Sequence, residues 1–295
     1  MVSMDEPAGY QLLDCGRGRR LEAFGRLVVD RPAPMANGSR HGSARWADAI
    51  AYRAGRGWAD AEGARPELVA SPVAIAGVTL EARLGSGGQV GLFPEHAVLA
   101  DSLRRSIHAR ITHDGAGAGP ALLNLFGHTG LLTLVAAQAG ASVTHVDASR
   151  PAVQAARLNA ERSGLADRPI RWIVDDAMAF VLREARRGRH YDGFIIDPPS
   201  YGHGARGNDD RGWLLDRDLG SLLTACQGLA TEATCWILSA HSPGWDARRM
   251  AMAIQDATGA RTPSEHVELA IHAQSGAVLA LGSAVLHDPL RSERR

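Results

Sequence analysis

The sequence contains no lysine, so arginine supplies all of its permanent side-chain positive charge. The 32 basic residues are matched by 32 acidic ones, which gives a formal net charge of zero and a pI near 7.2. This balance excludes the strongly basic overall charge of many nucleic-acid-binding proteins, although a local basic patch is compatible with it.

Cysteine is scarce as well. The chain has Cys15, Cys226 and Cys235, whose spacing matches no metal-binding motif, so the sequence predicts no metal site. No apolar run reaches the roughly 18 residues of a membrane-spanning helix. Residues 1–10 show neither the basic region nor the apolar core of a signal peptide. We therefore expect a cytoplasmic protein with reduced thiols.

What is present is organised around residues 121–147. Their pattern predicts one βαβ unit, with a strand over 121–125, a tight turn over 126–130, a helix over 131–139 and a second strand over 142–146. Gly127 and Gly130 allow the turn to be tight and to approach a ligand closely. Asp147, which closes the second strand, is placed to accept hydrogen bonds from the two hydroxyls of a ribose.

The turn differs from the dinucleotide-binding fingerprint. It keeps a G-x-x-G spacing but lacks one glycine and the loop that holds a pyrophosphate. Such a turn suits a ligand that has a ribose and no phosphates, a description that S-adenosylmethionine fits. The alternatives are a structural turn without a ligand and, for Asp147, an acid that caps the following helix.

The rest of the chain predicts an α/β fold. Strands and helices alternate after residue 120, which predicts a mostly parallel seven-stranded sheet, wrapped by helices, with an antiparallel edge. The further predicted strands cover 170–174, 191–196, 234–239, 267–272 and 277–286, and the further helices cover 97–109, 150–162, 178–187, 214–230 and 245–258.

Two domains are predicted, a small β-rich N-terminal region over 1–90 and the α/β domain over 91–295. In the N-terminal region we expect short strands, an irregular loop over 36–66 and a hairpin that turns at Ala76-Gly77. This region is interpreted either as a substrate-recognition module or as a lid over one edge of the main sheet.

Three acids, Asp147, Asp176 and Asp197, follow predicted strands at the edge where parallel sheets bind ligands. Asp176 is a candidate to accept from an adenine amino group, while the Ala177 amide faces a ring nitrogen. It is alternatively an acid stabilised by a helix dipole, and Asp175 is a rival for the adenine role.

The segment Asp197-Pro198-Pro199-Ser200-Tyr201 is the sharpest local signal. Two prolines fix the backbone after a buried strand, so the carbonyls beside them point outward and cannot enter a helix. Such a rigid acceptor can hold a base or polarise an amine, and Tyr201 is placed to stack on a planar ring. The alternative is a purely structural Pro-Pro turn.

Together these motifs resemble class I methyltransferases of Rossmann-like fold. More narrowly, they resemble the bacterial large-subunit ribosomal RNA methyltransferases of the 5-methylcytosine type, from about residue 88 to the C-terminus. The matching segments are Gly91-Leu92-Phe93-Pro94-Glu95, Asn124-Leu125-Phe126-Gly127-His128-Thr129-Gly130, Asp147-Ala148-Ser149, Arg157-Leu158-Asn159-Ala160, Asp175-Asp176-Ala177 and Asp197-Pro198-Pro199-Ser200-Tyr201-Gly202.

The resemblance implies S-adenosylmethionine as the cofactor and ribosomal RNA as the substrate, with a role in rRNA processing. It implies that the 126–130 turn holds the cofactor, with Asp147 at the ribose and Asp176 at the adenine. The candidate cofactor-binding residues are Phe93, Asn124, Phe126, Gly127, His128, Thr129, Gly130, Asp147, Ala148, Ser149, Asp176, Ala177 and Asp197.

Two departures from that family bear on the chemistry. The family's N-terminal RNA-binding PUA domain is not present in full. Methylation at cytosine C5 needs a thiolate that adds at C6, and Ala240 stands where that family has its cysteine after the fifth strand. Cys235 begins the predicted strand, about 16 Å away if the strand is extended, and Cys226 is expected on a helix.

The sequence therefore favours direct transfer to an atom that is already nucleophilic, such as guanine N7, an exocyclic amine, or an oxygen or nitrogen of a small molecule. His241 is a candidate general base or else a strand-end histidine bonded to backbone, and His203 and His128 are weaker candidates. The candidate catalytic residues are Asp197, Pro198, Tyr201 and His241.

Three arginines in the region after Tyr201 either contact RNA phosphates or are solvated, namely Arg206, Arg211 and Arg217. Two other interpretations stay open. One is a small-molecule N- or O-methyltransferase, and the other is a non-catalytic cofactor-binding protein of the same fold.

Overall fold

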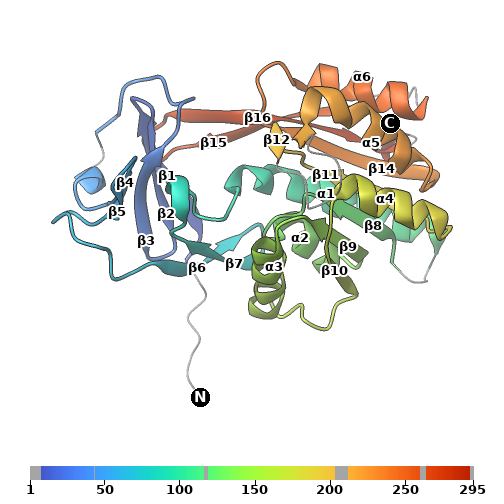
Figure 1. The fold of residues 1–295 in the computed structure, drawn as a ribbon, viewed down its shortest axis with the longest axis horizontal. Helices are drawn as coiled ribbons and strands as arrows, with labels where there is room; N and C mark the ends of the chain where they lie inside the picture. The colour runs from blue at the N-terminus through green and yellow to red at the C-terminus, as the bar shows by residue number, and fades with distance from the viewer. Residues whose placement is uncertain (1–7, 43, 116–118, 203–211, 260–263, 293–295) are drawn as a thin grey trace. The chain divides into compact units, whose positions relative to one another are not determined.

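The computed structural model describes residues 8–42, 44–115, 119–202, 212–259 and 264–292 of the 295-residue chain. The chain divides into two compact units, whose elements Figure 1 labels. The first unit comprises Met1–Ala97 and Ala270–Leu281, and the second comprises Val98–Leu269 and Gly282–Arg295. The sequence prediction put the boundary near residue 90 and assigned no C-terminal segment to the first unit.

The first unit is built mainly of antiparallel strands. Its five-stranded sheet has the order β1-β2-β3-β4-β5, and β6 and β7 form a separate hairpin. The strands are β1 (Tyr10–Gly16), β2 (Arg19–Phe24), β3 (Leu27–Pro32), β4 (Ile50–Arg53), β5 (Gly57–Ala59), β6 (Ala70–Ile75) and β7 (Val78–Arg83), and the 3₁₀ helices of the chain are η1 (Ala44–Trp46), η2 (Ser86–Gly88) and η3 (Pro94–Leu99).

The β6–β7 hairpin confirms the predicted turn. Ala76 and Gly77 have φ angles of 50° and 79°, the left-handed pair that a tight two-residue hairpin requires. The predicted irregular loop over 36–66 is wrong in part, because it contains β4 and β5. These strands pair antiparallel, and the rings of Tyr52 and Trp58 meet at 5.3 Å. Strands of this length show too little alternation to be recognised in sequence.

Asp14, on β1, ties distant parts of the first unit together. Its buried carboxylate accepts hydrogen bonds from the Trp46 indole at 2.9 Å and from the Ser275 hydroxyl at 2.8 Å. Ser275 belongs to the segment Ala270–Leu281, which is therefore fastened to the N-terminal strands by contacts far apart in sequence.

The second unit contains the predicted seven-stranded sheet, in the order β10-β9-β8-β11-β14-β16-β15. Neighbours from β10 to β14 are parallel, and β16 is antiparallel to β14. The strands are β8 (Ala121–Leu125), β9 (Ser142–Asp147), β10 (Ile170–Val174), β11 (Tyr191–Ile196), β14 (Ala230–Ala240), β15 (Glu265–His272) and β16 (Val278–His287). The mostly parallel sheet with an antiparallel edge is thus confirmed.

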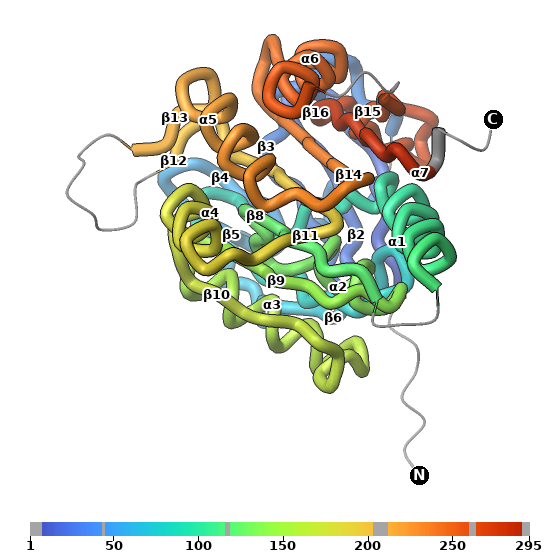
Figure 2. The backbone as a smooth tube through the Cα atoms, turned by 90° about the vertical axis from the view of Figure 1, so that its right-hand side faces the viewer, coloured from blue at the N-terminus to red at the C-terminus, as the bar shows by residue number. Residues whose placement is uncertain are grey.

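Helices cover both faces of this sheet. In Figure 2, α4, α5 and α6 lie on one side of it, and α1, α2 and α3 lie on the other. The helices are α1 (Ala100–Asp114), α2 (Leu131–Gln138), α3 (Arg150–Arg162), α4 (Ala177–Arg186), α5 (Leu215–Gln227), α6 (Ala247–Thr258) and α7 (Pro289–Ser292). Among the residues described, no helix has the length and apolar character needed to span a membrane.

The strand order reverses between β8 and β11. From β8 the chain proceeds outward to β9 and β10, whereas β11 leads to β14 on the other side. Open α/β sheets bind ligands at such a reversal, beyond the carboxyl ends of the strands. The segments that follow β8, β9, β11 and β14 therefore define the place where a site is expected.

Candidate functional site

The turn after β8 is held in an unusual backbone conformation. Phe126 and His128 have φ angles of 58° and 47°, and Gly130 has a φ of 93°. The Gly127 amide donates to the Val146 carbonyl at 3.0 Å, which fixes the turn against β9. Non-glycine residues rarely adopt positive φ, and they persist there only where surrounding contacts enforce it.

Gly127 lies directly against a buried histidine. A Cβ atom at this position would come within 2.5 Å of the His145 ring. The His145 Nδ1 atom lies 2.9 Å from the Thr133 hydroxyl, to which the Asn124 side chain donates at 2.7 Å. Asn124 is buried on β8, and its hydrogen bond to Thr133 supports the turn from within the sheet. Only glycine fits above this ring.

Burial keeps His145 uncharged. Desolvation, followed by the nearby His128, lowers the pKa of His145 to about 3. A charged imidazole is strongly disfavoured away from water. The layer beneath the 126–130 turn is therefore neutral in the folded protein near neutral pH.

Asp147 joins the two loops that follow β8 and β9. Its Oδ2 atom accepts from the His128 amide at 2.9 Å, and its Oδ1 atom accepts from the Ser149 amide at 2.8 Å. Ser149 in turn caps α3 by accepting from the Ala152 amide at 3.3 Å. A carboxylate oxygen has more than one acceptor site, so each Asp147 oxygen retains capacity for a ribose hydroxyl.

The acids after β10 have different local partners. Asp176 caps α4 by accepting from the Ala179 amide at 2.9 Å. Asp175 forms an ion pair with Arg183 and accepts from the Asp176 amide at 2.9 Å. Asp175 is therefore the more occupied of the two rivals for an adenine amino group, while the Ala177 amide opens α4 beside Asp176.

On the other side of the strand reversal, Asp197 lies beside residues of β14. Its Oδ1 atom accepts from the Ser239 hydroxyl at 2.6 Å and lies 3.6 Å from the His241 Nε2 atom. Both side chains remain partly exposed, with 19% for Asp197 and 29% for His241. The hydroxyls of Ser200 and Ser242 meet at 2.5 Å and join the same two loops. The structure thus brings a carboxylate and an imidazole together at adjacent strand ends.

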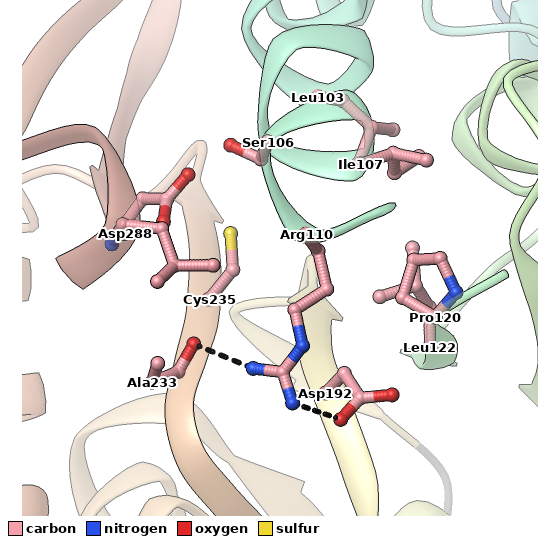
Figure 3. Close-up of a pocket in the computed structure, with 11 residues that line it drawn as sticks. Leu103, Ser106, Ile107, Arg110, Pro120, Leu122, Asp192, Ala233, Cys235 and Asp288 are labelled. Atoms are coloured by element: carbon pink, nitrogen blue, oxygen red, sulfur yellow. Dashed lines mark hydrogen bonds and ion pairs between the residues drawn. The ribbon is translucent and has the colours of Figure 1, made fainter. Parts of the chain in front are cut away.

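Ala240 is buried between these residues and has no reactive side chain. Cys235 lies in the middle of the same strand, five residues before Ala240, where it lines a small cavity with Arg110, Asp192 and Ser106 (Figure 3). Cys226 is fully buried in α5, and burial raises the pKa of its thiol. Neither of these two thiols stands at the end of β14, where position 240 is alanine.

A feature that sequence reasoning missed is Trp213. Its indole donates to the Pro199 carbonyl at 2.8 Å, and its ring packs on Phe126 with centroids 5.0 Å apart. It lies in the short strand β13 (Trp213–Leu214), which pairs with β12 (Tyr201–Gly202) and was not predicted either. The available signal was an aromatic residue just before a helix, close in sequence to the Pro-Pro segment.

The remaining predicted residues differ in what surrounds them. Tyr201 is 74% exposed and has space for a stacked ring. Arg217 forms local contacts, to Asp218 and to the Gly212 carbonyl. Phe93 belongs to the first unit, where its ring lies 6.0 Å from that of His96. His203, Arg206 and Arg211 lie outside the described residues.

Comparison with solved structures identifies the class of this fold. A SAM-dependent methyltransferase from Agrobacterium tumefaciens is 31% identical, superimposes with a TM-score of 0.84, and is matched over 96% of this chain and 91% of its own. SMU.776, solved in complex with SAH, shares the fold with a TM-score of 0.71 at 18% identity, over 95% of this chain and 75% of its own.

Curated relatives match a shorter region. "Ribosomal RNA large subunit methyltransferase I" of Photobacterium profundum is 36% identical over 123 residues, which cover 38% of this chain and 31% of that protein. "Ribosomal RNA large subunit methyltransferase K/L" of Stutzerimonas stutzeri is 38% identical over 135 residues, 45% of this chain and 17% of that protein. The match therefore spans a third or less of these two relatives. No protein-family model matches the sequence.

The described sheet and helices form an α/β fold of the methyltransferase type. The near full-length match at 31% identity makes the assignment specific, and the chain belongs to the S-adenosylmethionine-dependent methyltransferases. The cofactor of this family fits the residues present, because Asp147 lies beside the Gly127 turn and each of its oxygens, although it accepts one backbone amide, keeps capacity for a further hydrogen bond.

Proposed function

We propose that this protein transfers the methyl group of S-adenosylmethionine to a ribosomal RNA base, at an atom other than cytosine C5. The observation that carries the proposal is the Asp197–His241 pair beside Ala240, where a cysteine nucleophile would otherwise be needed. The names of the partial relatives support ribosomal RNA as the substrate.

The cofactor residues proposed are those of the first two loops. Asp147 accepts from the ribose hydroxyls with the acceptor capacity left after its two backbone hydrogen bonds. Asp176 and the Ala177 amide face the adenine, since Asp175 is engaged with Arg183. Phe126, Gly127, His128, Thr129 and Gly130 form the turn that the methionine part crosses, and Asn124, Ala148 and Ser149 support it. Phe93 is proposed only from the family resemblance.

The acceptor side follows from the chemistry of the residues. When bound, the cofactor supplies an electrophilic methyl group on a sulfonium, which an already nucleophilic atom attacks without a covalent enzyme intermediate. Asp197 and the outward-facing Pro198 segment accept from an exocyclic amine and orient it, and Tyr201 stacks on the base.

His241 receives the proton that an amine loses when it is methylated, and Asp197, 3.6 Å from the Nε2 atom, orients the imidazole. This pair therefore matches an acceptor that carries a proton. It is not required for an atom such as guanine N7, which loses none. Among the acceptors that the sequence leaves open, the pair favours an exocyclic amine.

A transfer assay tests the proposal. The protein and methyl-labelled S-adenosylmethionine are incubated in one reaction with ribosomal RNA from a host that lacks the gene. A second reaction contains a metabolite extract of that host in place of the RNA. Label in the RNA is the expected result. Label only in small molecules would assign the protein to metabolism. Cofactor binding without label in either pool would contradict the catalytic assignment.

A further inference from the structure

Trp213 lies outside the family motifs but touches both halves of the site described above. Its indole N–H donates to the Pro199 carbonyl at 2.8 Å, within the segment proposed to hold the acceptor base. Its ring packs against Phe126 at a centroid distance of 5.0 Å and an interplanar angle of 55°. Phe126 is the first residue of the turn proposed to hold the cofactor.

The neighbours of Trp213 fix it in place. Gly202 pairs with Trp213 and Tyr201 pairs with Leu214, so β12 and β13 form one small ribbon. The Leu215 amide donates to the Ser200 carbonyl at 3.1 Å, and the Leu214 amide donates to Asp218 at 2.8 Å at the start of α5. The backbone next to Trp213 is thus attached to α5 and to Ser200, while its indole is bonded to the Pro-Pro segment.

Phe126 needs a partner of this kind. Its φ of 58° is a left-handed conformation that a residue with a side chain adopts at a cost, and packing must hold it there. The Trp213 ring supplies that packing from the acceptor side of the site. A shift of Phe126 is therefore transmitted through one rigid side chain to the Pro199 carbonyl.

We infer that Trp213 is a positioning residue that aligns the acceptor segment with the cofactor turn. The inference rests on the proposed function and deepens it, because it names the residue that sets the geometry between the two substrates. Its indole N–H orients the Pro-Pro segment for transfer, and its ring stabilises the cofactor turn. Misplacement of a reacting group by about 1 Å can reduce a rate by about a hundredfold, so such alignment affects kcat.

Two substitutions separate the two contacts. Trp213→Phe keeps an aromatic ring against Phe126 but removes the N–H donor, so kcat should fall roughly tenfold or more while the Kd for S-adenosylmethionine changes less than about twofold. Trp213→Ala removes both contacts, and the Kd for the cofactor should rise as well. Calorimetry gives the Kd, and initial rates with the methyl-accepting RNA give kcat and KM.

Trp245→Phe is the matched control. Trp245 lies in the same unit and also donates its indole N–H at 2.8 Å, to Asp216, which keeps a second partner in Arg249. The control should lower thermal stability about as much as Trp213→Phe and leave kcat unchanged. If Trp213→Phe transfers methyl at the wild-type rate, or if it weakens cofactor binding as much as Trp213→Ala does, the inference is wrong.

A readout independent of turnover distinguishes this inference from the proposed function. Titration with S-adenosylhomocysteine should change the tryptophan emission of the wild type, and Trp213→Phe should lose most of that change. An equal change in both proteins would overturn the inference even if transfer to RNA is found. Loss of the change in Trp213→Phe would support the coupling even if the acceptor is not RNA.

Discussion

At the scale of single residues, Asp147 performs a structural task before any ligand arrives. Its two oxygens accept from the His128 and Ser149 amides, so one side chain joins the loops after β8 and β9. The family resemblance implies a ribose-binding role for Asp147, but a sequence motif does not reveal these two hydrogen bonds. Loss of the carboxylate would therefore loosen the site as well as remove an acceptor.

We predict that Asp147→Ala weakens binding of S-adenosylmethionine roughly 10- to 100-fold, because charge-assisted hydrogen bonds contribute about 1.5–3 kcal/mol each. Isothermal titration calorimetry measures the change. Asp167→Ala removes an exposed acid of the same unit and should bind the cofactor normally. Equal affinity of Asp147→Ala and the wild type would remove Asp147 from the cofactor site.

His145 makes stability depend on pH. Its pKa is lowered from 6.5 to about 3 by burial, so protonation favours the unfolded chain. The stabilisation is complete above pH 6.5 and is lost as pH falls from there toward 3. Between pH 7.5 and 5.5 we expect this residue alone to reduce the free energy of unfolding by about 1 kcal/mol.

Urea unfolding at the two pH values tests this expectation. His145→Gln retains a polar side chain next to Thr133 but cannot become charged, so its unfolding free energy should fall by about 1 kcal/mol less than that of the wild type over the same pH interval. His190→Gln, which alters an exposed histidine, should behave like the wild type. Identical pH dependence of all three proteins would mean that His145 is not the titrating group.

At the scale of elements, the β8–α2 turn is built around the absence of a side chain at position 127. Gly127→Ala would place a Cβ within 2.5 Å of the His145 ring, which is held by Thr133 and cannot move freely. We predict a loss of about 1–3 kcal/mol of stability and a marked loss of cofactor affinity. Denaturant unfolding and calorimetry measure the two effects.

Gly220→Ala is the control for that substitution. Gly220 lies in α5 with nothing within 4 Å of an added Cβ, so alanine there should stabilise the protein by about 0.5–1 kcal/mol through helix propensity. If Gly127→Ala is as stable as Gly220→Ala and binds the cofactor normally, the close packing on His145 is not what selects glycine.

Most elements of the second unit were predictable because their periodicity is strong. The bounds of β8, β10 and β11 agree with the sequence prediction residue for residue, since each is a short apolar run between turn signals. The β12–β13 ribbon was missed because two-residue strands have no period. Trp213 was missed for a related reason, because its partners Phe126 and Pro199 are distant in sequence.

At the scale of the whole molecule, the division into units was only partly predictable. The segment Ala270–Leu281 packs in the first unit through Leu279 and Ala273 beside Leu12, a contact between opposite ends of the chain that no local pattern encodes. The candidate site was easier to predict from the sequence, because its acids follow strands that are consecutive in the chain and belong to one parallel sheet. The contact of Asp197 with His241 could not be predicted from the sequence, because it depends on the pairing of β11 with β14.

The central claim is that methyl transfer proceeds without a cysteine nucleophile. The most direct measurement is mass analysis of the nucleosides in ribosomal RNA that the purified protein has methylated, compared with RNA from the strain that lacks the gene. The account predicts a new methyl group on a base nitrogen, with an exocyclic amine favoured by the Asp197–His241 pair. New 5-methylcytidine would contradict it, because position 240, at the end of β14, is alanine and carries no thiol.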